Sequence, residues 1–399
     1  MIKKIMGKFD YFKTIYLVLM YSFIPLFFLY SEGDNLFTIL FSVYSFVFFF
    51  NFRPNALSNS FKIFTVIHLL WISGIALSII LGKSNLSYLE RPLKMLPYLL
   101  FYFPIQKYSL PLKKISVITL TTFIIVVTLL FIQNINGVYR ATLHQNINVL
   151  STSSFLALSF LLIPYSKNIK NILSKLITLT LMSLILFFTK TRGVMLVFLT
   201  QTILFPLTTK LSNTKKLLFI FIITSISFIF YSNNKVVKQR INKIDQQISS
   251  FKKNNVNTSI GLRLFYWTNS IENLNKNLIF GIGKKGIEKV LRKKNKDLNY
   301  NISQNDLPAK HLHSNIIEFW ITRGLIGLFI LLFMYIFLIR MTYYSFKCNH
   351  SYKYISLTVT CCLIVLGFIE TVFRMTHSST LLISMIYMII GQKQYEESN

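Results

Sequence analysis

Residues 321–341, ITRGLIGLFILLFMYIFLIRM, contain no acidic residue, and their only charged side chains, Arg323 and Arg340, lie near the two ends. The hydrocarbon layer of a membrane is about 30 Å thick, and a helix needs about 20 apolar residues to cross it. Within lipid the backbone must satisfy its own hydrogen bonds, which favours a helix. This stretch therefore predicts a membrane-spanning helix.

Similar apolar stretches recur along the whole chain of 399 residues, which is 53% hydrophobic, 16% aromatic and only 14% charged. Such a composition is typical of an integral membrane protein. The predicted fold is all-α, with about twelve transmembrane helices, at residues 12–30, 35–51, 62–81, 92–105, 114–134, 149–165, 171–188, 193–207, 216–232, 321–341, 353–372 and 377–391. We expect a membrane domain at 1–232, a loop domain at 233–320, and a second membrane part with a short tail at 321–399.

Lysines in the short loops predict the orientation of the bundle. With a cytoplasmic N-terminus, one face collects lysines from every second loop, among them Lys107, Lys113, Lys167 and Lys210. The basic leader has no small-residue cleavage site, so we expect an uncleaved first helix. An even number of spans returns the C-terminus to the cytoplasm. The loop domain between the ninth and tenth spans is then extracytoplasmic.

Two helices are expected inside this loop domain. A basic amphipathic helix would run through Val236, Ile241 and Ile248. In the second, Ile260, Leu264, Trp267 and Ile271 recur at helical spacing, and Thr258 or Ser259 precedes them as a candidate N-cap. The glycines of FGIGKKG are expected to end this region of helix.

The formal net charge of +30 would suggest nucleic-acid binding in a soluble protein. In a membrane protein, the orientation rule and the anionic inner leaflet explain much of this charge. We therefore expect membrane lipid as a partner and no nucleic acid. The three cysteines, Cys348, Cys361 and Cys362, fall in a cytoplasmic loop and inside a span, so no disulfide is expected.

Arginines and histidines gather on the expected outer face, which favours an anionic ligand, because a guanidinium offers a planar fork of donors that stays charged. Lys190 and Arg192 lie in the short turn of FFTKTRGVML, and Arg263 lies in TSIGLRLFYW of the loop. Each also has an ordinary interpretation, as a helix-end anchor or as a solvated surface charge. Arg140 and Arg91 are isolated basic residues on the same expected face, and the same interpretations apply to them.

His313 is the candidate general base. It precedes Ile316, Ile317 and Trp320 at helical spacing, so we expect it to head an interfacial helix that leads into the tenth span. A neutral imidazole there could accept a proton from a hydroxyl nucleophile. A plain polar interface residue is an equally open interpretation. Glu318 would lie about 140° around the helix from His313, which disfavours a direct contact.

The sequence supports no strong metal or cofactor site. His311 and His313 lack further ligands at suitable spacing, although Glu32 and Asp34 could hold a divalent ion on a diphosphate. No GxxxxGK phosphate loop lies in a strand–loop–helix context. We expect no cofactor, no metal, and a substrate that arrives already activated.

Three motifs together resemble the O-antigen ligase and polymerase superfamily, and most of all the lipopolysaccharide O-antigen ligases. They are TKTRG at residues 189–193, GLRLFYW followed by NKNLIFGIG in the long loop, and HLHSNIIEFWITRGLIG at residues 311–327. The resemblance implies transfer of a glycan from an undecaprenyl diphosphate carrier to the lipid A core, with inversion and without a metal. It places this reaction on the periplasmic side of the bacterial inner membrane.

The resemblance also implies roles for individual residues. Arg192 and Arg263 match the arginines that bind the carrier diphosphate, and His313 matches the general base. Many members have HNH where this chain has His313, Ser314 and Asn315, so His313 is the one base that the motif supplies. The remaining expected substrate-binding residues are His311, Lys190, Arg140 and Arg91.

Three other functions stay open at this point. The first is an O-antigen polymerase of the same superfamily, which would extend the carrier-linked glycan. The second is a metal-dependent polyprenyl glycosyltransferase that uses Glu32 and Asp34. The third is a transporter of the lipid-linked glycan, which is disfavoured because the chain shows no inverted repeat or paired helices broken by glycine or proline.

Overall fold

The computed structural model is all-helical in the part of the chain that it describes, as the composition predicts. The described residues are 2–30, 33–52, 57–138, 143, 147–158, 170–189, 191, 194–200, 212–214, 217, 221, 235–253, 255–297, 302, 312–348, 350–369, 373 and 376–398.

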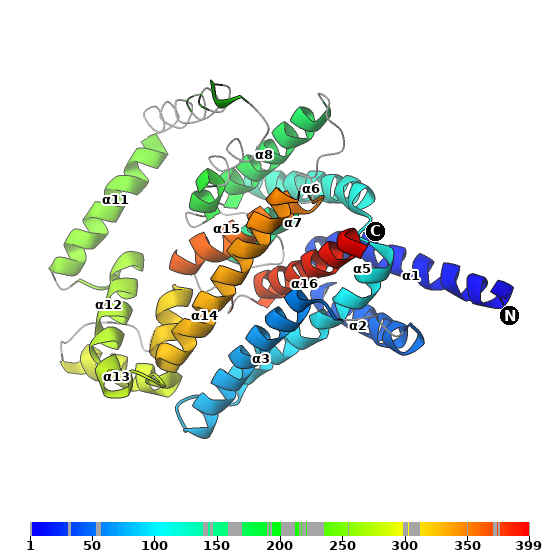
Figure 1. Ribbon diagram of the computed structural model, residues 1–399. Coiled ribbons are helices and arrows are strands. Elements are labelled where there is room, and N and C mark those ends of the chain that lie inside the picture. The colour runs from blue at the N-terminus through cyan, green and yellow to red at the C-terminus, as the bar shows by residue number, and fades with distance from the viewer. Residues whose placement is uncertain are drawn as a thin grey trace.

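The first half of the chain forms α1 (Ile2–Leu29), α2 (Gly33–Asn51), α3 (Asn59–Ile80), α4 (Ser87–Met95), the 3₁₀ segment η1 (Leu96–Phe101), α5 (Tyr102–Tyr108), α6 (Leu112–Ile135), α7 (Ile147–Leu158) and α8 (Lys170–Thr189). The second half forms α11 (Lys235–Lys252), α12 (Ser259–Glu272), η3 (Leu274–Asn277), α13 (Gly283–Asp297), α14 (Asn315–Lys347), α15 (Lys353–Ile369) and α16 (Thr376–Ser398). Figure 1 shows α11–α13 along one side of the bundle, with α12 and α13 near the beginning of α14.

Four of the described helices are long and apolar enough to cross a membrane: Tyr11–Leu29, Asn59–Ile80, Leu112–Ile135 and Asn315–Lys347. Shorter apolar helices occupy Asn35–Asn51, Thr180–Thr189 and Lys353–Phe368. Each of these helices overlaps a predicted span, which supports a membrane protein. The number twelve stays a prediction, and the spans expected at 193–207 and 216–232 fall largely outside the described residues.

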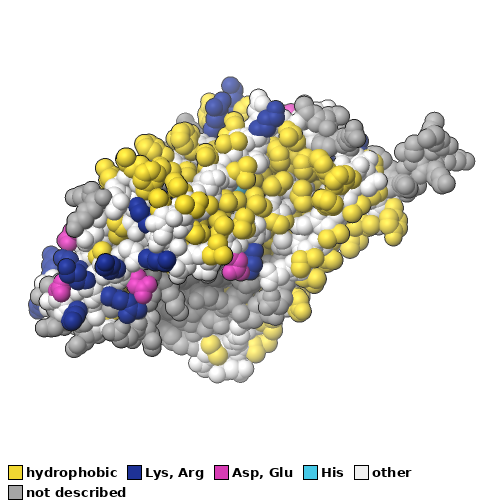
Figure 2. Space-filling model, turned by 90° about the horizontal axis from the view of Figure 1, so that it is seen from below, with side chains coloured by type: hydrophobic (Ala, Val, Ile, Leu, Met, Phe, Trp, Pro, Cys, Tyr) yellow, Lys and Arg dark blue, Asp and Glu magenta, His cyan; other side chains and the backbone are white. Residues whose placement is uncertain are grey.

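The surface of the bundle keeps many large apolar side chains exposed, including those of Phe46, Phe50, Phe131 and Ile336. In Figure 2 hydrophobic side chains cover a broad area, and many of the Lys and Arg side chains gather at the end where α11–α13 lie. Apolar exposure on this scale is what lipid would cover.

The stretch predicted as one span at 92–105 is divided into α4, η1 and α5, so the prediction of a single short helix there is wrong. Pro97 lies in the first turn of η1, and Pro104 lies in α5. A proline has no backbone N–H to donate, and its ring crowds the preceding turn, which explains why a regular helix does not run through.

The loop helices form a small core of their own. Val256, Phe265, Ile287 and Leu291 are buried in a cluster that also includes Leu312. Both predicted loop helices are confirmed as α11 and α12. The N-cap of α12 is Thr258, whose hydroxyl accepts a hydrogen bond from the Gly261 N–H at 2.9 Å.

A backbone clasp joins this loop region to α14. The Ile282 N–H donates to the Ile321 carbonyl, and the Leu325 N–H donates to the Leu278 carbonyl, both at 2.9 Å. Gly324 interrupts α14 with φ 64° and ψ −152°, and Gly281 has φ 68°. A Cβ on either glycine would collide with the opposite backbone, so only glycine lets the two segments approach this closely.

Lys83, in the connection between α3 and α4, fixes the same region from the other side. Its Nζ donates to the Gly281 carbonyl at 2.8 Å and to Asn277 Oδ1 at 3.3 Å. Its own carbonyl accepts from the Lys285 N–H at 3.0 Å. The loop region is therefore held against both α3 and α14.

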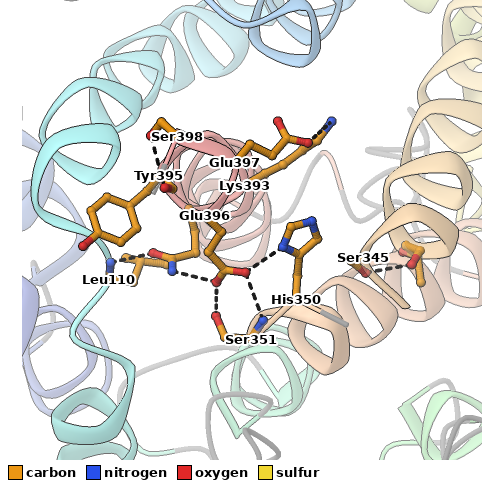
Figure 3. Close-up of polar contacts among 11 residues, drawn as sticks. Leu110, Ser345, His350, Ser351, Lys393, Tyr395, Glu396, Glu397 and Ser398 are labelled. Atoms are coloured by element: carbon orange, nitrogen blue, oxygen red, sulfur yellow. Dashed lines mark hydrogen bonds and ion pairs between the residues drawn. The ribbon is translucent and has the colours of Figure 1, made fainter. Parts of the chain in front are cut away.

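A polar cluster lies beyond the other end of α14 (Figure 3). There the Glu396 carboxylate accepts from His350 Nδ1 at 2.7 Å, from the Ser351 N–H at 3.3 Å and from Gln392 Nε2 at 2.9 Å. Burial alone would raise the pKa of Glu396, but the hydrogen bonds from Gln392, Ser351 and His350 outweigh it and lower that pKa below its usual value. The cluster ties the end of α16 to the turn between α14 and α15.

Candidate functional site

His313 lies just before α14 and outside it. The helix begins at Asn315, and the N-cap Ser314 accepts a hydrogen bond from the Ile317 N–H at 3.4 Å. His313 itself has φ 52°, a left-handed conformation that few non-glycine residues adopt. The expected helix that leads into the tenth span is confirmed, and His313 lies directly before the serine that caps it.

The peptide groups of Leu312, directly before His313, are held from two sides. The Leu312 N–H donates to the Glu318 carboxylate at 2.8 Å, and the Leu312 carbonyl accepts from the Trp267 indole N–H at 2.5 Å. Leu312 is fully buried. After His313, the Ser314 hydroxyl donates to the Gly367 carbonyl at 3.2 Å. Contacts from α12, α14 and α15 therefore hold the residues on both sides of His313.

Glu318 forms a buried ion pair with Lys284 of α13, and only 6% and 9% of these two side chains remain exposed. One carboxylate oxygen meets the lysine and the other accepts from Leu312. A buried charge pair depends on hydrogen bonds to its remaining polar atoms, and the Leu312 N–H provides one such bond to Glu318. Glu318 therefore acts on the backbone directly before His313.

Arg263 lies one helical turn before Trp267 on α12, on the same face of that helix. Since Trp267 bonds the residue before His313, this face of α12 lies against the His313 segment. Arg263 is half-buried. The structure thus brings Arg263 and His313, two of the residues singled out in the sequence, into one region.

The other expected site residues fall outside the described part of the chain, either wholly or in their side chains: Lys190, Arg192, Arg140, His311 and Arg91, whose backbone lies in α4. The same holds for Glu32 and for the side chain of Asp34. Around the TKTRG motif, the described helix α8 ends at Thr189 and described helical residues begin again at 194. Within the described residues, no group of three His, Cys, Asp or Glu side chains could hold a metal ion.

Sequence reasoning missed Lys284 and the contact of Trp267. Trp267 was identified only as an apolar position of α12, and Lys284 only as part of FGIGKKG. No local pattern could have found these contacts, because Trp267 and Leu312 are 45 residues apart in the chain. A cavity of about 250 Å³ adjoins the Lys284–Glu318 pair, between α3, α4 and the first turns of α14.

Comparison with known proteins gives two findings. Residues 177–332 match the model of a family described as O-antigen ligase. This match confirms the resemblance carried by the motifs, and it spans Arg192, Arg263, Lys284, His313 and Glu318. A protein of Haemophilus influenzae (strain ATCC 51907 / DSM 11121 / KW20 / Rd), described only as an uncharacterized protein, is 30% identical over 139 residues, which are 34% of this chain and 32% of the relative. The chain thus matches about a third of the length of that relative.

Proposed function

From the match of residues 177–332 to the O-antigen ligase family, we propose that the protein is a glycosyltransferase that ligates an O-antigen glycan to the lipid A core. The donor is the glycan linked to undecaprenyl diphosphate. The observation that carries the proposal is the geometry of residues 312–314. His313 lies between Leu312, whose peptide groups are bonded by Trp267 and Glu318, and Ser314, whose hydroxyl donates to the Gly367 carbonyl.

In the proposed reaction His313 takes the proton of the acceptor hydroxyl as its oxygen attacks the anomeric carbon of the donor sugar. The new glycosidic C–O bond forms while the bond from that carbon to the diphosphate oxygen breaks, and the electron pair leaves with the diphosphate. Attack from the face opposite the leaving group inverts the anomeric carbon. A base held in place before the substrate arrives lowers the barrier because little reorganisation remains to be made.

Arg263 and Arg192 stabilise the charge that develops on the leaving diphosphate. Guanidinium groups do this without losing a proton, and they are most effective where water is scarce. Lys190, Arg140, Arg91 and His311 complete the proposed substrate-binding set. The reaction as proposed requires no metal ion, because these cations supply the positive charge.

The proposed setting is the bacterial inner membrane, with twelve spans, both termini in the cytoplasm and the active site facing the periplasm. Residues 1–232 and 321–399 form the membrane domain, and residues 233–320 form the periplasmic loop domain. The contacts of Lys83 and Gly324 with the loop region support a site at the junction of these parts.

Reconstitution tests this function against its alternatives. Purified protein in vesicles is given the carrier-linked glycan and lipid A core in the presence of EDTA. Ligation predicts glycan attached to lipid A core, with no loss on chelation. Longer carrier-linked glycan would identify a polymerase of the same superfamily. Loss of product with EDTA would indicate a metal-dependent enzyme, and movement of the carrier lipid without a glycosidic product would indicate a transporter.

A further inference from the structure

The cavity beside the Lys284–Glu318 pair has the size of a site for one small ring. Its volume is about 250 Å³, and its walls come from α3, α4, α13 and α14, with Phe373 on a further side. Pockets that bind drug-sized ligands are larger, about 300–1,000 Å³. The space therefore suits a single unit of a ligand, such as one sugar ring, and not a long chain.

One wall of the cavity is aromatic. The ring centroids of Trp71 and Phe373 are 5.0 Å apart, those of Phe319 and Phe373 are 5.8 Å apart, and Trp71 and Phe319 stack at 6.2 Å with an interplanar angle of 27°. Mutual contact of the three rings makes this wall rigid. The Phe373 ring is tilted by 57° to the other two rings, and such an apolar wall can pack against the C–H face of a sugar ring.

The rest of the lining is polar and carries charges of both signs. Lys284 and Arg323 contribute positive charge, while Glu90 and Glu318 contribute negative charge. Lys284 is engaged by Glu318, and the Arg323 guanidinium lies over the Phe319 ring, 4.3 Å from its centroid. A diphosphate would meet two carboxylates here. A neutral ligand with many hydroxyls can use donors and acceptors alike, including Ser87.

The cavity is coupled to His313 by two of its lining residues. Glu318 faces the cavity and also accepts the Leu312 N–H. Asn315 lines the cavity and follows His313 by two positions in the chain. A sugar in this cavity therefore lies beside the segment that carries the proposed base.

We infer that this cavity is the acceptor subsite, which binds one neutral sugar ring of the lipid A core and presents its hydroxyl to His313. This inference rests on the proposed function, and it adds the residues that recognise the acceptor. The donor diphosphate binds elsewhere, among the arginines.

A matched pair of substitutions at the beginning of α4 tests the subsite. Ser87 lines the cavity and is exposed, so Ser87→Phe fills the space without disturbing the core. Leu86 is 72% exposed and does not line the cavity, so Leu86→Phe is the control. In transfer assays Ser87→Phe should raise KM for lipid A core about tenfold or more and leave KM for the donor unchanged. A rise in KM for the donor, or no change for either substrate, would overturn the subsite.

A binding measurement separates this inference from the proposed function. The probe is core oligosaccharide freed of lipid A, and the signal is the fluorescence change that depends on Trp71, identified with Trp71→Phe. Wild type and Leu86→Phe should bind the oligosaccharide, whereas Ser87→Phe should not. Binding without any transfer would reject the ligase and keep the subsite. Equal binding by Ser87→Phe, or displacement of the sugar by inorganic pyrophosphate, would reject the subsite whatever the transfer assay shows.

Discussion

For the single residue His313, the proposed role depends on how the backbone before it is held. Trp267 donates its indole N–H to the Leu312 carbonyl, and Glu318 accepts the Leu312 N–H. Because His313 adopts a left-handed conformation, its orientation depends on these neighbours and not on a regular helix. Loss of one contact should therefore affect the catalytic step more than substrate binding.

Trp267→Phe tests this view, since it removes the indole N–H and keeps most of the ring. We expect kcat to fall about five- to tenfold, with both KM values nearly unchanged. One hydrogen bond contributes about 1 kcal/mol, and its loss here would raise the barrier by about that amount because it holds His313 in position. Trp320→Phe is the control, because the Trp320 indole nitrogen is buried without a hydrogen-bond partner in the described structure. An equal loss of kcat in both variants would contradict the positioning role.

The buried pair of Lys284 and Glu318 gives a second prediction. Lys284→Met leaves the carboxylate buried without its cation, which should destabilise the protein by about 3–5 kcal/mol. Adding Glu318→Gln removes the uncompensated charge and should restore much of the melting temperature measured in detergent. Arg292→Met breaks the exposed pair with Glu288 and should change stability by less than about 1 kcal/mol. If Lys284→Met lost little stability, the ion pair would not be what holds α13 to α14.

At the scale of elements, local signals predicted much and long-range contacts could not be predicted. The Thr258 cap and the helix α12 lie within one segment of sequence, and both are confirmed. The buried face of α12 carries Phe265 and Tyr266, and Ile271 of the predicted apolar face is exposed. The division of the stretch at 92–105 could have been anticipated from Pro97. The clasp between Gly281 and Gly324 joins segments more than 40 residues apart, so no periodic pattern in the sequence could have predicted it.

Gly324→Ala tests the clasp between the loop region and α14. A Cβ there meets the Ile279 carbonyl, and the backbone conformation is one that only glycine adopts easily. We expect faster proteolysis within residues 233–320 and a lower melting temperature.

Gly82→Ala provides the matched control, because Gly82 also has a positive φ, of 69°, but a Cβ there would meet nothing within 4 Å. It should cost about 1 kcal/mol, from backbone strain alone. If both variants resisted protease equally, the close approach of the two backbones would not be what holds the loop region in place.

At the scale of the whole molecule, the two ends of α14 have different roles. Its beginning carries the proposed site, and its far end is fastened to α16 by the Glu396 cluster (Figure 3). With 33 residues, α14 is longer than the membrane crossing of about 20 residues requires. The extra length lets one helix connect the two regions.

The Glu396 cluster predicts a pH dependence of stability. The pKa of Glu396 in the folded protein lies below the usual 4.5. The stabilisation that the charged carboxylate provides is therefore fully present above about pH 4.5, and it is lost as the pH falls through the lowered pKa. The melting temperatures of wild type and Glu396→Gln should therefore differ at pH 7 and converge below pH 4.5. A difference that stays constant down to low pH would assign the effect of Glu396 to packing instead of charge.

The proposed role of His313 as the base of a glycosyl transfer can be tested by comparing the wild type with His313→Ala in one reconstituted assay. The assay contains purified protein, undecaprenyl-diphosphate-linked glycan, lipid A core and EDTA, with both proteins matched in melting temperature. We expect glycan on lipid A core with the wild type, and a rate lower by about 10²–10⁴-fold with the variant, the usual contribution of general acid–base catalysis. Equal rates from the two proteins would contradict it.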